Sequence, residues 1–329
     1  MLRAPGGAAA LVERRLAAID ALNGRLRAMI TVTADAARDL AKAQDRAVAA
    51  GHWSGPLAAM TVSLKDVIHT AGVRTTNGSD IDRDFIPSED AEVVRRLKAA
   101  GAIVVGKNNL HEYAYGGTTQ NPFHGSCRNP WDTERIPGGS SGGSGSSVAA
   151  GMCCASLGTD TAGSGRLPAA LCGVTGLRPT SGAIPNRGVT AVSAFFDTIS
   201  PMARSAVEVA AVFSAISGYD PKDPFSSDHP AARMPPRPDG RLKGLRIGIP
   251  ANYFFDGVEP GVETATGLAI AQLENLGATT VSVDLPGAAE TCGHFERLFH
   301  TDCAFEHRDR FAAHAGRLGA DTRDRLESL

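Results

Sequence analysis

This 329-residue chain lacks the sequence features of membrane-spanning, secreted and nucleic-acid-binding proteins. No apolar run reaches the roughly 18 residues that a membrane-spanning helix needs. Met1–Arg15 carries Arg3, Glu13 and Arg14, so it lacks the uninterrupted apolar core of a secretion signal. The formal net charge is only −2, which excludes the strongly basic surface of a nucleic-acid-binding protein. We therefore expect a cytoplasmic protein that binds neither a membrane nor, directly, a nucleic acid.

Paired cysteine motifs are also absent, although the chain has six cysteines. No C-x-x-C occurs, and Cys153 and Cys154 are adjacent within an apolar run. A buried free cysteine behaves as a small apolar residue. We expect all six thiols to be reduced, as in a reducing compartment.

One group of metal-binding residue types stands near the end of the chain. His300, Cys303 and His307 fall at i, i+3 and i+7 of a helical pattern, so they share one helix face and could ligate a metal. No fourth ligand or fixed spacing motif accompanies them. We interpret them as a partly buried helix face, and we expect neither a metal nor a cofactor.

The composition, with 43% hydrophobic and 21% charged residues, suits one large or two medium globular domains. Leucine and isoleucine spacings predict a helical arm at the N-terminus, over residues 1–54. Beyond it, helical and strand patterns alternate, which is typical of an α/β fold with parallel pairing. The expected strands are 57–64, 102–105, 153–157, 244–250 and 279–285, and the expected helices are 88–100, 144–150, 164–171, 205–217, 259–276 and much of 288–329. The last two strands and the helix between them predict a further βαβ unit on the same sheet.

The most informative stretch is 137–180, which holds two Ser/Gly clusters joined by an apolar run. The clusters are Pro137–Ser144 and Gly158–Arg166. Small residues at this density let backbone N–H groups and hydroxyls approach a ligand, because no Cβ intervenes. A flexible linker is one interpretation, but a linker has no reason to lie within core-like sequence. A phosphate-binding loop is another, but no lysine occurs between Lys107 and Lys222.

A serine nucleophile is the third interpretation of this stretch. Gly138–Gly142 formally matches the G-x-S-x-G elbow, which needs a strand directly before it. The preceding 128–137 segment is loop-like and contains two prolines. An α/β-hydrolase esterase therefore fits poorly. It would also need an essential histidine, drawn from His229, His294, His300, His307 and His314.

Three segments together resemble the amidase signature family: SLKD at 63–66, GGSSGGS at 138–144 and GTDTAGSGR at 158–166, continued by PAALCGV and GLRPT. The resemblance runs from about residue 57 to about residue 223. It implies a mixed, mostly parallel sheet covered by helices on both faces, and a Ser-Ser-Lys triad. Carried over by motif, Lys65 is the base, Ser140 the bridging serine and Ser164 the nucleophile. The family also implies a cis peptide bond between Gly139 and Ser140.

Lys65 must be uncharged to act as a base. Its pKa must fall from about 10.4 to about 7–8, and burial produces shifts of that size. Its position at the end of an apolar strand favours such burial. Lys107 also ends a predicted strand and is the obvious rival, but its neighbours do not match the family's base motif.

A nucleophile at the start of a helix lies beside unpaired backbone N–H groups. Such donors stabilise an oxyanion. The expected donors are the backbone amides of Thr161, Ala162, Gly163 and Ser164. As supporting residues we expect Ser141, Asp160 and Arg166, the last two as an ion pair beneath the loop.

The function that the resemblance implies is hydrolysis of a small-molecule amide through an acyl-enzyme. The run at 162–166 is similar to allophanate-hydrolase-like members, which indicates a carboxamide or urea-derived substrate. Two alternative functions stay open. The chain could be the glutamine amidase subunit of a tRNA-dependent amidotransferase, or it could be an inactive truncated homologue. The second arises because the predicted 55–329 amidase domain ends earlier than family members usually do. The possible protein partners are a second copy of the chain, in a homodimer, or amidotransferase-type partner subunits.

Overall fold

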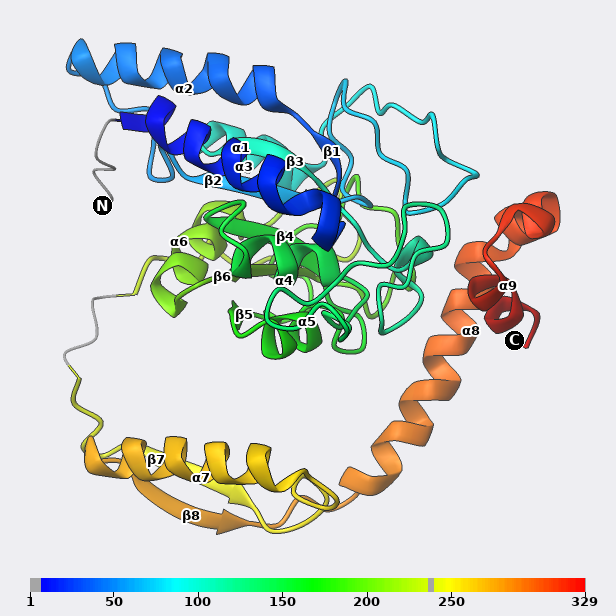
Figure 1. Ribbon diagram of the computed structural model, residues 1–329. Helices are drawn as coiled ribbons and strands as arrows, with labels where there is room; N and C mark the ends of the chain where they lie inside the picture. The colour runs from blue at the N-terminus through cyan, green and yellow to red at the C-terminus, as the bar shows by residue number, and fades with distance from the viewer. Residues whose placement is uncertain (1–6, 236–239, 329) are drawn as a thin grey trace. The chain divides into compact units, whose positions relative to one another are not determined.

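The computed structural model describes residues 7–235 and 240–328, and the chain divides into two compact units. The first unit runs to Met234 and resumes at Asp302, and the second is Pro235–Thr301. Figure 1 traces the elements along the chain. In order they are α1 (Gly7–Leu26), β1 (Met29–Val32), α2 (Ala34–Ala49), β2 (Thr61–Lys65), α3 (Glu92–Ala99), β3 (Ile103–Asn108), η1 (Glu112–Ala114), α4 (Gly142–Ala149), β4 (Ala155–Thr159), α5 (Arg166–Leu171), β5 (Thr175–Gly176), β6 (Ile199–Ala203), α6 (Ala206–Ile216), β7 (Arg246–Pro250), α7 (Pro260–Asn275), β8 (Thr279–Val283), α8 (Ala288–His314), η2 (Ala315–Arg317) and α9 (Ala320–Glu327).

The first unit is built on a six-stranded sheet with the order β1-β3-β2-β4-β6-β5. Strand β2 lies between β3 and β4 and is parallel to both. Strands β1 and β6 run antiparallel to their neighbours β3 and β4, and β5 is antiparallel to β6. Four of the six strands, β2, β3, β4 and β5, therefore share one direction. The predicted mixed, mostly parallel α/β sheet is confirmed.

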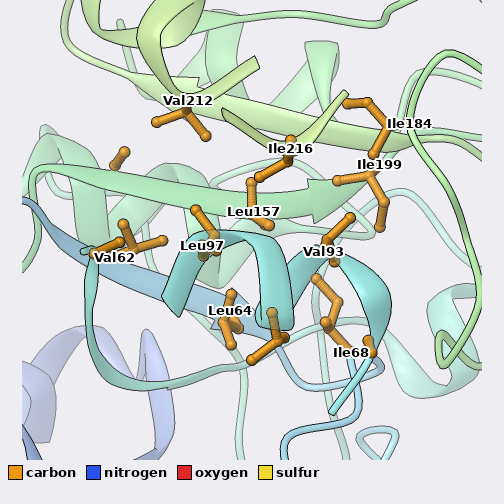
Figure 2. Packing of buried hydrophobic residues seen from close by; sticks show 14 of the residues in the cluster. Val62, Leu64, Ile68, Val93, Leu97, Leu157, Ile184, Ile199, Val212 and Ile216 are labelled. Carbon is orange, nitrogen blue, oxygen red and sulfur yellow. The ribbon is translucent and has the colours of Figure 1, made fainter. Parts of the chain in front are cut away.

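The two faces of this sheet carry separate cores because side chains alternate along a strand. Val62 and Leu64 of β2 pack with α3 and α6, and with Leu157 of β4 (Figure 2). The other face packs against α1, α2 and α4, with Ile103 and Val105 of β3 contributing. Lys65 alternates with Leu64, so its side chain points to the face that α4 covers.

The N-terminal segment differs from the prediction of helices alone. Helix α1 continues through Gly24, and strand β1 follows it and pairs with β3. This four-residue strand has no clear alternation of its own, and only its hydrogen bonds to β3 give it strand character. Sequence periodicity over the long helical window therefore concealed it.

The prediction that the last βαβ unit extends the main sheet is wrong. Strands β7 and β8 are parallel to each other, as predicted, but form a separate two-stranded sheet in the second unit. A βαβ pattern determines how its own two strands pair, but it carries no information about which sheet they join. None of the helices in residues 7–235 and 240–328 is long and apolar enough to span a bilayer.

Candidate active site

Lys65 ends strand β2 with its side chain completely buried. Its Nζ donates to Ser140 Oγ at 2.6 Å and to Thr159 Oγ1 at 2.7 Å. Within the described ranges no carboxylate lies at ion-pair distance from this amine. Burial lowers the pKa of Lys65 to about 7, against the opposing charges of Asp197 and Asp160. Near neutral pH a large fraction of this amine is therefore unprotonated and able to accept a proton.

Ser140 precedes helix α4, and its peptide bond with Gly139 is cis, as the family resemblance implied. The residue is buried, and its carbonyl accepts the N–H of His111 at 3.1 Å. A Cβ at Gly139 would lie 2.7 Å from the backbone of Gly117. Glycine is therefore required where this loop passes the 117–119 backbone, directly before Ser140.

Ser141 connects the three segments of the site. Its Oγ donates to the carbonyl of Thr159 at 3.1 Å and accepts the N–H of the same residue at 3.2 Å. Its own N–H donates to the carbonyl of Ser164 at 3.2 Å. The start of α4, the end of β4 and the loop that carries Ser164 are thereby held together.

Ser164 lies two residues before helix α5 and is half-buried. Its hydroxyl forms no hydrogen bond with any residue that the structure describes, so the expected link between Ser140 Oγ and Ser164 Oγ is not made here. The backbone bond from Ser141 nevertheless keeps the two serines on neighbouring segments.

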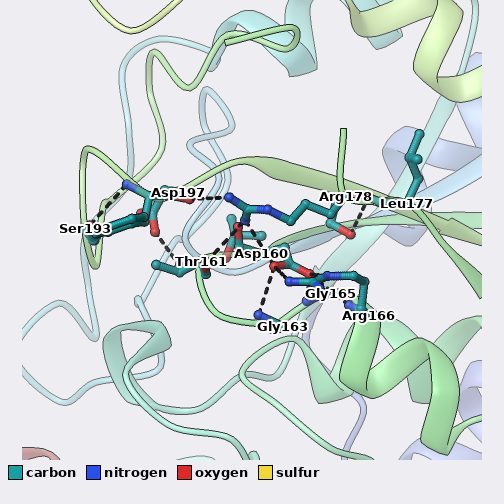
Figure 3. Close-up of polar contacts among 12 residues, drawn as sticks. Asp160, Thr161, Gly163, Gly165, Arg166, Leu177, Arg178, Ser193 and Asp197 are labelled. Atoms are coloured by element: carbon teal, nitrogen blue, oxygen red, sulfur yellow. Dashed lines mark hydrogen bonds and ion pairs between the residues drawn. The ribbon is translucent and has the colours of Figure 1, made fainter. Parts of the chain in front are cut away.

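Asp160 organises the loop around Ser164 (Figure 3). It accepts the backbone N–H groups of Gly163, Gly165 and Arg166 at 2.9, 3.2 and 3.0 Å. The guanidinium groups of Arg166 and Arg178 also contact it, at 3.0 and 3.1 Å. Burial opposes ionisation, but the Arg166 hydrogen bonds outweigh it and lower the pKa of Asp160 to about 2. The predicted Asp160–Arg166 pair is present, and Arg178 is an additional partner that sequence reasoning missed.

These contacts reduce the set of available oxyanion donors. The N–H of Gly163 donates a hydrogen bond to the carboxylate of Asp160. This contact conflicts with the expectation that the Gly163 amide faces the substrate. The loop that carries Ser164 therefore keeps three backbone donors, those of Thr161, Ala162 and Ser164, without an acceptor in the described chain.

Thr159 and Asp197 are two further residues of the site that sequence reasoning did not select. Thr159 carries no charge but is the second hydroxyl partner of the Lys65 amine. Asp197 is buried and accepts a hydrogen bond from Thr161 Oγ1. Burial raises the pKa of Asp197 to about 6, although Thr161 favours its charged form. The polar end of strand β4 could have indicated Thr159, whereas only the fold brings Asp197 to the loop.

Lys107 lies on the strand beside Lys65 but has different partners. Its Nζ donates to Thr75 Oγ1 at 2.6 Å and lies 3.2 Å from Asp66 Oδ1. Burial lowers the pKa of Lys107, and Asp66 opposes that shift. The carboxylate identifies Lys107 as half of a buried ion pair. In the C-terminal helix, Cys303 and His307 are buried whereas His300 is exposed, so the three do not form one buried group.

Known proteins resemble this chain over most of its length. The family model described as Amidase matches residues 10–311. A glutamyl-tRNA(Gln) amidotransferase subunit of Roseiflexus sp. (strain RS-1) is 46% identical over 276 residues, which cover 84% of this chain. The corresponding subunit of Anaeromyxobacter sp. (strain K) is 47% identical over 277 residues. The match covers 56% of each of these relatives, so the chain spans little more than half of their length.

A solved structure is also similar to this chain over nearly its whole length. A chain described as part of a vestigial protein complex that reveals the evolutionary origins of an s-triazine catabolic enzyme superposes with a TM-score of 0.91. It is 37% identical, and the alignment covers 98% of this chain and 70% of that chain.

Proposed function

The chain belongs to the amidase family, and from this premise we propose that it hydrolyses an amide C–N bond with Ser164 as nucleophile, Ser140 as proton relay and Lys65 as base. The observation that carries the proposal is the Lys65 amine: it is fully buried, has no carboxylate partner in the described chain, and lies 2.6 Å from Ser140 Oγ. A buried lysine held by hydroxyls alone is suited to accept a proton rather than to keep one.

In the proposed reaction Ser164 Oγ attacks the amide carbonyl as its proton passes to Ser140 and the proton of Ser140 passes to Lys65. The carbonyl oxygen becomes negative and accepts hydrogen bonds from the free N–H groups near Ser164. Such donors typically contribute about 2.7–4 kcal/mol each to the transition state. The C–N bond then breaks, and the leaving amine takes the proton back through Ser140. Water hydrolyses the resulting acyl-enzyme by the same relay.

For the substrate we propose a small carboxamide or urea-derived molecule. The Ala162–Arg166 run is similar to that of allophanate-hydrolase-like members, and the solved neighbour is described in terms of an s-triazine catabolic enzyme. Both point toward compact, nitrogen-rich substrates. An assay that measures ammonia release from urea derivatives, simple amides and aryl amides distinguishes among these substrate classes.

A second candidate is the glutamine amidase subunit of an amidotransferase. The 46% and 47% identity to glutamyl-tRNA(Gln) amidotransferase subunits favours it. In that case glutamine is the substrate and partner subunits are required. Ammonia release from glutamine that appears only when the partner subunits of a relative are added would favour this candidate over independent hydrolysis.

A fluorophosphonate probe tests the proposed nucleophile without knowledge of the substrate, because the phosphorus reacts with an activated serine and releases fluoride. We expect one label per chain, on the peptide that contains Ser164, and none in Ser164→Ala. Ser146→Ala is the matched control, since this buried α4 serine donates to the carbonyl of Arg128 at 3.0 Å and has no proposed chemical role. A label on another serine would refute the assignment.

A further inference from the structure

A chain of hydrogen bonds, one of them donated by a backbone N–H, leads from the loop of Ser164 to helix α8. Thr161 Oγ1 donates to Asp197 Oδ1, and the backbone N–H of Ser193 donates to Asp197 Oδ2 at 3.3 Å. Ser193 Oγ in turn donates to Asp302 Oδ2. Figure 3 shows the first of these contacts, with Thr161 and Ser193 on either side of Asp197. All four residues belong to the first unit.

Asp197 is fixed by its own surroundings. Its carboxylate accepts three donors, since the N–H of Val192 also reaches Oδ2, at 2.9 Å. The next residue, Thr198, exchanges backbone hydrogen bonds with Asp160 at 2.8 and 3.2 Å. Asp197 therefore lies directly beside the point where strand β4 gives way to the nucleophile loop. It is held there by backbone contacts that do not depend on its side chain.

The nucleophile loop is anchored at two places, and the two anchors hold different parts of it. Asp160 holds the C-terminal part through the amides of Gly163 and Gly165. The side chain of Thr161 is held by Asp197, while Arg178 Nη1 approaches the Thr161 carbonyl at 3.4 Å. The N–H of Thr161 is one of the three backbone donors of this loop that have no acceptor in the described chain. Rotation about the Thr161 backbone would turn this donor away from a developing oxyanion.

We propose that Asp197 is a positioning residue that orients the Thr161 backbone through the Thr161 hydroxyl, and that Asp302 of α8 supports it through Ser193. This inference rests on the proposed function, because it assigns a role to the loop of the proposed nucleophile. Asp302 additionally accepts the N–H of Phe195 at 3.2 Å, so it holds the 193–195 backbone as well as the Ser193 hydroxyl. Helix α8 thereby becomes part of the support of the site.

The test measures fluorophosphonate labelling of the full chain at several probe concentrations. Thr161→Val removes the hydroxyl but keeps the backbone amide, and Asp302→Asn removes the distal charge. A misplacement of about 1 Å costs on the order of 100-fold in rate. We expect the limiting rate of labelling to fall at least about tenfold in Thr161→Val and about threefold in Asp302→Asn. The half-saturating probe concentration should stay the same in both variants, since the site still binds the probe.

Asp309→Asn is the matched control for Asp302→Asn, because it makes the same change on the same helix at an exposed side chain. It should label at the wild-type rate. Thermal melting of each variant separates loss of folding from loss of positioning. Wild-type labelling away from Ser164 would refute the proposed function itself. Wild-type labelling at Ser164 with unchanged limiting rates in folded Thr161→Val and Asp302→Asn would refute only the positioning role.

Discussion

Two buried lysines on adjacent strands have opposite electrostatic surroundings. Lys65 of β2 contacts two hydroxyls, whereas Lys107 of β3 contacts the carboxylate of Asp66 and one hydroxyl. Burial lowers the pKa of both; Asp66, at ion-pair distance, opposes the shift of Lys107, whereas the carboxylates that oppose the shift of Lys65, Asp197 and Asp160, form no ion pair with it. The comparison teaches that burial alone does not make a lysine a base. The absence of a close carboxylate is what leaves the Lys65 amine free to accept a proton.

Strand register separates the two lysines. Val62 pairs with Val104, but Ser63 pairs with Gly106, so Val105 is an extra residue in β3. Leu64 then lies beside Lys107, and Lys65 beside Asn108. Paired residues of neighbouring strands share a face, and therefore the two lysines point to opposite faces. A Cβ at Gly106 would lie 2.4 Å from the carbonyl oxygen of Thr31, so glycine is required at the irregularity.

The largest expected effect is on reactivity. In Lys65→Met the relay has no base, and removal of one member of such a triad lowers the rate by up to about 10⁶-fold. We expect fluorophosphonate labelling of Ser164 to fall by at least about 1,000-fold while the free energy of unfolding stays close to that of the wild type. Lys65→Arg should be equally slow, because arginine cannot deprotonate. Labelling within tenfold of wild type in either variant would contradict the role of Lys65.

The second effect is on stability and concerns the other lysine. Lys107→Met leaves Asp66 buried without its cation, and breaking one side of a buried ion pair costs about 3–5 kcal/mol. Urea unfolding should show a loss of that size. The double variant Lys107→Met/Asp66→Asn should recover part of it, since no uncompensated charge remains. Equal stability of the single variant and the wild type would show that the Asp66 contact is not an ion pair in solution.

The third effect is the pH dependence of the reaction. The pKa of Lys65 is lowered to about 7, and only the unprotonated amine accepts a proton. The labelling rate should therefore rise about tenfold between pH 6 and pH 8, with its midpoint near pH 7. The labelling rate is measured at each pH by stopping the reaction at a series of times and determining the intact mass of the protein. A midpoint near the ordinary lysine value of 10.5 would mean that the amine is not desolvated.

The smallest effect concerns the second hydroxyl on the Lys65 amine. Thr159→Val removes a hydrogen bond of 2.7 Å but keeps the shape of the side chain. A hydrogen bond typically contributes about 0.5–1.5 kcal/mol, so we expect a threefold to tenfold fall in the labelling rate. Thr159→Ser, which keeps a hydroxyl, should be closer to wild type than Thr159→Val. The reverse order of the two variants would rule out the hydrogen bond as the cause.

Much of the fold and of the proposed triad follows from sequence pattern. Helix and strand alternation indicated an α/β sheet, and the motifs selected Lys65, Ser140 and Ser164. The structure brings Lys65 and Ser140 into contact and ties Ser164 to Ser141, although the link between the Ser140 and Ser164 hydroxyls is not made. Strand β1 and the separate β7–β8 sheet were not predictable, because both depend on partners far along the chain.

The sequence by itself determined which residue types are available: small residues around a serine, a lysine at a strand end, and a carboxylate beside the loop. Only the tertiary structure decided which lysine lacks a close carboxylate, which amide of the loop is already used by Asp160, and that Asp197 holds Thr161. The physical reason is that local pattern encodes helix and strand character. The charge state of a buried amine and the orientation of an amide depend on neighbours that only register and packing bring together.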